Sequence, residues 1–183
     1  MKDRFGFLAR GLRSHKKTIL LITTAVVATL AVSSLISIWL SSISDLEFPS
    51  IGTIVFEGVE GYWDIDLTNK TGAEAPYDWG LICPGATSNL TLYLRSISNV
   101  DTELRHVETN WTFRNSTDGA VAPPANISQF MYVMWDYDNS TVHPGETRRA
   151  ILTLHAESSS PFIEFLITND VIAFSFDMTI STY

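Results

Sequence analysis

Few side chains in this 183-residue sequence have the type and spacing that acid–base or nucleophilic chemistry needs. Cys-x-x-Cys, Gly-x-Ser-x-Gly, His-x-x-x-His and glycine-rich phosphate-binding motifs are all absent. Because catalysis needs titratable groups that converge, we expect no enzyme activity, no catalytic residues and no cofactor. His155, on an expected strand, is interpreted as solvent-facing. The histidines are scattered at His15, His106, His143 and His155.

One set of cation ligands can be read from the segment WDYDNST, where Asp136, Asp138 and Asn139 offer oxygen atoms that suit calcium. The segment lacks the ligand spacing and the distal glutamate of an EF-hand loop. Asp and Asn beside a turn more often hydrogen-bond their own backbone than a metal. We therefore expect a turn here and keep the three residues only as calcium candidates.

Three aromatic side chains, Trp111, Trp135 and Tyr137, could stack on sugar rings, as in a carbohydrate-binding adhesin. Trp135, however, alternates with Met131 and Val133 along a strand-like segment. Such alternation indicates a side chain that faces a core. We therefore expect Trp135 to be a core residue.

Acceptor motifs for N-linked glycans, Asn-x-Ser/Thr, occur six times, and none has proline in the middle position. All of them lie after residue 44, as expected if that part of the chain is outside the cell. Asn110, in TNWTF, lies beside an aromatic residue that could bury it. The predicted sites are Asn69, Asn89, Asn110, Asn115, Asn126 and Asn139.

Residues 18–44 form an uncharged, largely apolar run that exceeds the roughly 20 residues needed to cross a bilayer. By the positive-inside rule, the basic residues before the run predict a cytoplasmic lead at 1–17, a transmembrane helix at 18–44 and an extracellular domain at 45–183. A cleaved signal peptide would have a shorter apolar core, so we expect a retained single-pass anchor in the cell membrane. Only Asp3 opposes the basic residues, which are Lys2, Arg4, Arg10, Arg13, Lys16 and Lys17.

Small residues recur at every fourth position of this run. A stripe of this kind lets a second helix approach closely, and its hydroxyl groups can bond across the contact. Alternatively, each hydroxyl bonds a carbonyl of its own helix. We expect a packing face, formed by Ala25, Thr29, Ser33, Ser37 and Ser41.

Charge and cysteine content limit the partners and the sources of stability. The chain has 20 acidic and 12 basic residues, and every acidic residue except Asp3 follows residue 44. Such an acidic domain repels nucleic acid, so we expect no nucleic-acid partner. Cys83 is the single cysteine, so the chain can form no internal disulfide and packing must stabilise the domain.

Beyond Pro49 the apolar pattern changes to a period of two, which is typical of half-buried strands. Trp63, Ile65 and Leu67 are expected to share one face, as are alternate residues from Ile172 to Ile180. We predict an all-β fold, namely an antiparallel immunoglobulin-like β-sandwich of about seven strands, preceded by a single transmembrane α-helix. A short helix could form at 161–168. The expected strands are residues 52–56, 61–68, 88–97, 104–113, 130–137, 150–156 and 171–180.

A short internal similarity supports this fold. CPGATSNLTLYL at 83–94 and HPGETRRAILTL at 143–154 share Pro-Gly-x-Thr followed by alternating apolar residues. Proline presets φ at the second turn position, and glycine accepts the positive φ that follows. Both segments are therefore expected to be a turn that leads into a strand of one sandwich.

The succession DWGLICPGATSNLTLYLRSISNV, TNWTF, MWDYDNSTVHPGETRRAILTL and FSFDMTI resembles short archaeal surface proteins that pair an N-terminal membrane helix with one immunoglobulin-like sandwich. The resemblance covers roughly residues 78–180, and its motifs are structural, so it implies a fold rather than an activity. More distantly, the chain is similar to archaeal thread and TasA-type filament subunits, in which an N-terminal strand completes the sheet of the next subunit. It departs from them by keeping its membrane segment.

These observations favour a non-catalytic, membrane-anchored, glycosylated surface protein whose partners are membrane lipid, N-linked glycans and other surface proteins or copies of itself. The alternatives are a filament subunit that donates a strand, an accessory subunit of a larger membrane complex, and the adhesin described above. Residues 48–59 are apolar enough to pair with a sheet edge, either in their own domain or in a neighbouring one. The first strand of the same domain is the simpler expectation.

Overall fold

The structure is a computed structural model that describes residues 16–44, 46–72 and 74–183, with helix side chains described at 20–34. It divides into two compact units, Met1–Ile43 and Ser44–Tyr183. Most of the predicted cytoplasmic lead lies outside the described residues, as do the side chains of Ser37 and Ser41.

The first unit contains the helix α2, Lys16–Ser44. Every described side chain of α2 is exposed, including seven large aliphatic ones that are distributed around the whole helix. Among the residues that the structure describes, no helix meets the combined length and apolarity required to cross a membrane. The exposed aliphatic residues are Leu20, Leu21, Ile22, Val26, Val27, Leu30 and Val32.

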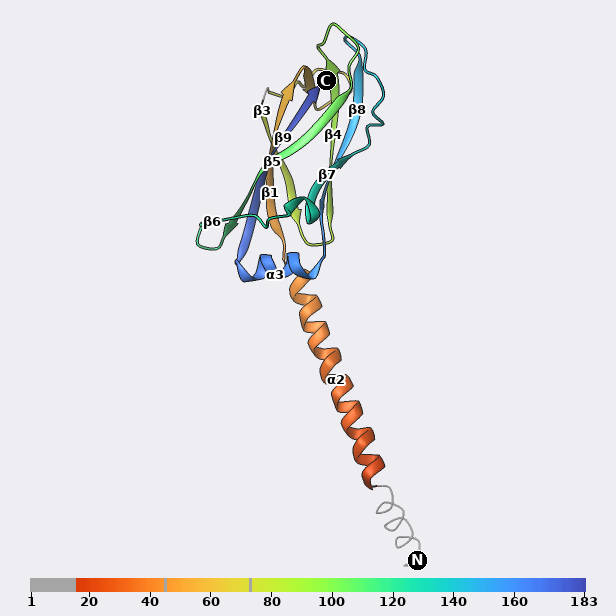
Figure 1. Cartoon of the computed structure of the whole chain (residues 1–183), viewed down its shortest axis with the longest axis vertical. Coiled ribbons are helices and arrows are strands. Elements are labelled where there is room, and N and C mark those ends of the chain that lie inside the picture. Colours follow the sequence, from red (N-terminus) through yellow and green to blue (C-terminus); the bar gives the residue numbers. More distant parts are fainter. Residues whose placement is uncertain (1–15, 45, 73) are drawn as a thin grey trace, which may run out of the picture. The chain divides into compact units, whose positions relative to one another are not determined.

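The second unit is a β-sandwich of two facing sheets (Figure 1). One sheet has the order β3-β1-β9-β5-β6 and the other has the order β2-β4-β8-β7. The first consists of β3 Glu74–Ile82, β1 Phe48–Glu57, β9 Val171–Thr182, β5 Leu104–Asn115 and β6 Ala120–Val121. The second consists of β2 Val59–Tyr62, β4 Thr87–Ser96, β8 Thr147–Ala156 and β7 Met131–Trp135. The predicted β-sandwich is confirmed, and its predicted antiparallel pairing holds for all described strand pairs of the two sheets except β1 with β9.

Alternating side chains from both sheets fill the core. In β4, for example, Leu90, Leu92 and Leu94 are buried while Asn89 is exposed, which places this predicted glycan acceptor on the outer face.

A short 3-10 helix, η1 Ile127–Gln129, precedes β7. The helix α3, Ser160–Thr168, closes one end of the sandwich with three buried side chains, Phe162, Ile163 and Leu166 (Figure 1). Its proline near the first turn suits a helix start, and the predicted helix at 161–168 is confirmed.

The two Pro-Gly segments form the same turn and lead into neighbouring strands. Gly85 and Gly145 have φ values of 88° and 73°, and a backbone hydrogen bond closes each turn, at 2.9 Å from Ala86 to Cys83 and at 3.0 Å from Glu146 to His143. The strands that follow, β4 and β8, pair antiparallel along their length. The internal similarity therefore marks adjacent strands of one sheet.

The predicted strand at 61–68 is wrong beyond Tyr62. The Asp64 carboxylate accepts hydrogen bonds from the backbone N–H groups of Thr68 at 3.0 Å and Asn69 at 2.9 Å, and so forms a turn in place of a ladder. Leu67 has a φ of 54° within this turn, and Ile65 is 71% exposed. Trp63, Ile65 and Leu67 therefore do not share a buried face.

Two further features differ from the prediction. β1 pairs with β9 in parallel, although the other strand pairs described in the two sheets are antiparallel. In β9, Phe174, Phe176, Met178 and Ile180 are buried as expected, but Ile172 is exposed because the pairing register with β5 shifts near its start. β3 was not predicted, since Pro76 and Gly80 interrupt its pattern.

Candidate functional site

Each histidine of the sandwich lies next to a carboxylate of its own. The nitrogen–oxygen distances are 3.3 Å from His106 to Glu108, 2.8 Å from His143 to Asp101 and 3.2 Å from His155 to Glu157. His155 alternates with the buried Leu154 and Ala156 and so lies on the outer face of β8, where it is half-buried beside the Tyr132 ring. Among the described residues, no three histidine, cysteine, aspartate or glutamate side chains converge as metal ligands do.

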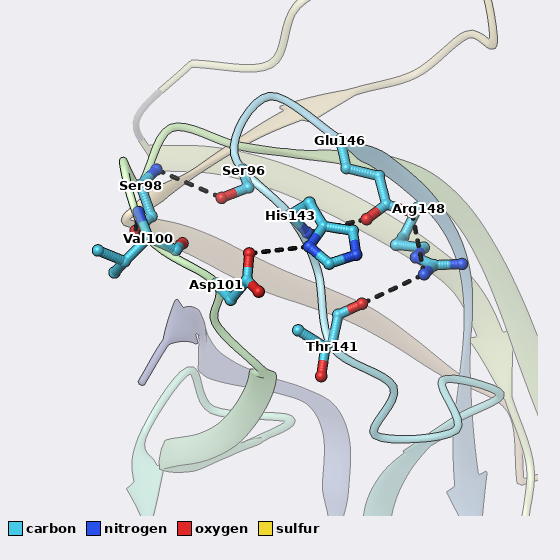
Figure 2. Close-up of polar contacts among 8 residues, drawn as sticks. All are labelled: Ser96, Ser98, Val100, Asp101, Thr141, His143, Glu146 and Arg148. Atoms are coloured by element: carbon cyan, nitrogen blue, oxygen red, sulfur yellow. Dashed lines mark hydrogen bonds and ion pairs between the residues drawn. The ribbon is translucent and has the colours of Figure 1, made fainter.

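A polar cluster joins the chain segment before β5 to the turn before β8 (Figure 2). The His143 Nδ1 atom lies 2.8 Å from the Asp101 carboxylate, and the His143 backbone N–H donates to the Glu146 carboxylate at 2.8 Å. The Arg148 guanidinium is 2.9 Å from Glu146 and donates to the Thr141 carbonyl at 3.2 Å. The cluster thus fixes the turn before β8 against the chain segment that precedes β5.

The interactions of this cluster are of the kind that stabilises loops. The Asp101 carboxylate raises the pKa of His143 through a hydrogen bond and its charge, which favours the imidazolium over a neutral base. Of the hydroxyl groups drawn in Figure 2, that of Ser98 donates to the Val100 carbonyl at 3.0 Å and accepts from the Val100 N–H at 3.1 Å, and that of Ser96 accepts from the Ser98 N–H at 3.3 Å. A nucleophile activated by a base would instead have its hydroxyl on the imidazole.

A second polar site connects the two sheets at the β5 and β7 strands. The His106 Nε2 atom donates to the Val133 carbonyl at 2.9 Å, and the Glu108 carboxylate accepts from the Val133 N–H at 3.0 Å. The side chains are only 16% and 22% exposed, and the His106 ring lies edge-on to Trp135 at 4.6 Å. The N–H and the C=O of Val133 on β7 are therefore both bonded by side chains from the other sheet.

Opposing effects set the pKa values at this site. Burial alone would lower the pKa of His106, but hydrogen bonds to Glu108 and to the Val133 carbonyl outweigh it, so the pKa is raised. Burial alone would raise the pKa of Glu108, and the hydrogen bond and charge of His106 outweigh that, so the pKa is lowered. The pair therefore favours an imidazolium next to a carboxylate.

Two of the calcium candidates accept hydrogen bonds from backbone N–H groups, Asp136 from β8 and Asp138 from its own turn. The Asp136 carboxylate accepts from the Ile151 N–H at 2.6 Å, and the Asp138 carboxylate accepts from the Ser140 N–H at 3.0 Å. Asn139 is exposed and has a φ of 58°, which is a conformation that Asn tolerates at turns. The predicted turn is confirmed, and the three residues form no convergent ligand set with these geometries.

The three candidate sugar-stacking residues lie on different sheets and pack against other rings. Trp111, on β5, stacks on Phe176 with ring centres 4.4 Å apart. Trp135, on β7, meets Tyr137 edge-on at 5.1 Å, and Tyr137 is buried with its hydroxyl donating to the Ser140 carbonyl. Trp135 packs against the core, as predicted.

The predicted glycan acceptors all reach the surface of the sandwich. Five are exposed, and the sixth, Asn115, is half-buried in the turn between β5 and β6. Asn110 sits in a bulge of β5 with a φ of 55°, and its amide donates to the Asp177 carboxylate at 2.8 Å. The adjacent Trp111 ring points to the core, so it does not bury Asn110. The exposed acceptors are Asn69, Asn89, Asn110, Asn126 and Asn139.

In the predicted helix-packing stripe, the Thr29 hydroxyl donates to the carbonyl of Ala25 at 2.8 Å. This is the alternative in which a helix satisfies its own hydroxyl groups. Cys83 carries a free, half-buried thiol before the first Pro-Gly turn.

Sequence reasoning missed the His106 and Glu108 site. The signal was the spacing His-x-Glu, which occurs at 106–108 and again at 155–157. Side chains two residues apart on a strand lie on the same face, so this spacing places an imidazole beside a carboxylate.

Comparisons with known proteins give little beyond the fold. No protein-family model matches the chain. No curated protein matches it either. One similar solved structure is the ASH / PapD-like domain of human CEP192 (PapD-like domain 7), at 10% identity and a TM-score of 0.30, covering 54% of this chain and 72% of that chain. A likeness this slight says nothing about what the chain does.

Proposed function

We propose that this chain is a non-catalytic, glycosylated cell-surface protein that one helix anchors in the membrane and whose sandwich contacts other surface proteins or copies of itself. The observation that carries the proposal is the placement of the six acceptor asparagines. All are at least partly exposed, although they occur on a strand, on a bulge and in several turns. This is the distribution that a glycosylated outer domain needs, because glycans are bulky and must lie at the surface.

The exposed side chains of α2 support the anchoring part of the proposal. A helix that is apolar around its whole circumference needs apolar surroundings, either lipid or other helices. The described aliphatic residues of α2 have that distribution. Together with the uncharged run at 18–44 and the basic residues before it, they favour a membrane-embedded helix with its C-terminal end outside.

The polar clusters support a role without catalysis. The carboxylates of Asp64, Asp136, Asp138 and Glu146 accept hydrogen bonds from backbone N–H groups, so their chemistry is used to fix turns and loops. A catalytic group would instead point toward a space where a substrate can bind.

The alternative functions receive less support from the geometry. β1 lies between β3 and β9 of its own sheet, which favours the first strand of the same domain over a strand donated to a neighbour. The packing of Trp111 and Trp135 against other aromatic rings likewise does not favour a sugar-binding platform.

The topology can be tested in intact cells that produce the full chain with one epitope tag at the N-terminus and another at the C-terminus. Protease added outside should remove the C-terminal tag and leave the N-terminal one, and the N-terminal fragment should stay in the membrane pellet after alkaline extraction. Lysed cells, in which both tags should be lost, are the control. Protection of the C-terminal tag, or release of the fragment by alkali, would contradict the proposal.

A further inference from the structure

The strand β7 is an edge strand with an unusual composition. It is the last strand of the four-stranded sheet, and its sequence, MYVMW, contains no charge, proline or glycine. An apolar edge strand of this kind readily pairs with a strand from another molecule, and natural proteins usually protect it with charges, proline or a bulge. β7 itself carries none of these protections.

The protection comes instead from the other sheet. In an antiparallel ladder, every second residue of an edge strand points its N–H and C=O away from its partner strand. Val133 is such a residue, because both of its backbone groups bond to side chains of β5 at 3.0 Å and 2.9 Å. Glu108 provides the acceptor and His106 the donor, so the pair reproduces the two bonds that an added strand would make.

Two other edge strands, β3 and β2, are closed in other ways. β3 contains Pro76, is bulged near Ser50 and Ile51 of β1, and has its Gly80 N–H bonded to the Asp78 carboxylate at 2.8 Å. β2 is followed by chain that returns along it, with the Thr71 N–H bonded to the Gly61 carbonyl at 2.8 Å. At β7, by contrast, the closure depends on the side chains of His106 and Glu108, which could withdraw.

We propose that the outer edge of β7 is a strand-pairing surface for a second copy of this chain, and that His106 and Glu108 hold it closed. A two-fold axis at Val133 would let the Val133 residues of two copies exchange both backbone hydrogen bonds. The same register places Tyr132 opposite Met134 of the second copy, an aromatic–thioether contact on the outer face, where Met134 is 49% exposed. No like charges meet, because β7 has none.

The main test compares the full chain in detergent micelles with its double variant His106→Ala/Glu108→Ala, by light scattering over a range of concentrations. Wild type and variant share the same helix, so any association through α2 is common to both. We expect the variant to shift toward a dimer by about tenfold or more in its association constant, since two bonds become available to a partner strand. Adding Met134→Lys should reverse the shift by placing a charge on the edge.

The matched control is Asp101→Ala/His143→Ala, which removes another close His–carboxylate pair, one that makes no hydrogen bond to β7. Its association should equal that of the wild type. An unchanged association constant in the His106→Ala/Glu108→Ala variant, or a shift that Met134→Lys does not reverse, would overturn the proposal.

Amide hydrogen exchange keeps the proposal testable if the double variant folds poorly. In Glu108→Ala, the Val133 amide should exchange about tenfold faster in dilute, monomeric protein, while the amides of neighbouring β8 keep their protection. In Glu108→Gln, the side-chain oxygen can still accept from Val133, so protection should remain. Equal exchange at Val133 in wild type and Glu108→Ala would show that the edge is not closed by this side chain.

Discussion

At the scale of single residues, polar side chains in this sandwich mostly take over hydrogen bonds that the backbone leaves open. Asp64 and Asp138 bond the N–H groups of turns, and Glu108 bonds the free N–H of an edge strand. Unpaired backbone groups are costly when covered, so each such contact replaces a bond to water. These carboxylates therefore stabilise turns and a strand edge of the sandwich.

The His106 and Glu108 pair should make stability depend on pH. The folded state raises the pKa of His106, so the contribution is fully present below the unfolded pKa of about 6.5 and is lost as the pH rises through the folded value. The pKa of Glu108 is lowered in the folded state, so this carboxylate stabilises the fold at pH values above its ordinary pKa. At pH 6 that contribution is already complete. We expect the full chain in detergent to unfold at lower urea concentration at pH 8.5 than at pH 6.

Glu108→Gln isolates this effect from the other histidines. Without the carboxylate, the difference in unfolding free energy between pH 6 and pH 8.5 should shrink by on the order of 1 kcal/mol. Asp101→Asn is the comparison, because it removes the carboxylate that raises the pKa of the exposed His143. Urea titrations of the three proteins at both pH values measure the difference. A Glu108→Gln variant with the wild-type pH dependence would show that this pair does not contribute.

At the scale of elements, the sequence predicted those strands whose two faces differ clearly. β4, β5, β8 and most of β9 alternate between apolar and polar residues, and each was found close to its expected position. The Pro-Gly turns were predictable because proline and glycine have defined backbone preferences. Alternation alone failed at 63–67, where the Asp64 side chain stabilises a turn locally, and at β3, an edge strand that tolerates proline.

The turn glycines allow a direct test of the shared turn. Gly145 has a φ of 73° and no atom near the position of an added Cβ, so Gly145→Ala should cost roughly 1–2 kcal/mol through backbone strain alone. Gly145→Asn should cost less, because Asn tolerates this conformation better. Unfolding free energies from urea titration give both values. Equal stability of Gly145→Ala and wild type would contradict the turn geometry.

Two substitutions in β1, one on each face of the strand, test whether β1 is packed in its own sheet. Ile54 is fully buried, whereas Ile51 on the opposite face is 53% exposed. If β1 is an integral central strand, Ile54→Ala should lower the unfolding free energy by about 2–5 kcal/mol and Ile51→Ala by about 0.5 kcal/mol or less. Urea titration of both variants in detergent checks this. Similar small losses for both would mean that β1 is not packed in its own domain.

At the scale of the whole molecule, the candidate sites and the fold differ in how far the sequence could predict them. Sequons, charge bias and an apolar run can be read directly from residue order. The contacts of His106 and Glu108 with Val133 could not be read in this way, because they depend on how the two sheets approach each other at β5 and β7. Glu108 and Val133 are 25 residues apart in sequence. Local patterns predict which face of a strand is buried, but not which edges meet.

The central claim, a membrane-anchored glycoprotein, is tested most directly by the intact mass of the chain extracted with detergent from the membranes of the cells that make it naturally. We expect the protein in the membrane fraction with its helix retained and with a mass above that of the polypeptide, and replacement of each acceptor Asn by Gln should lower the mass in discrete steps. A chain found in the soluble fraction, or one with the unmodified polypeptide mass, would contradict the account.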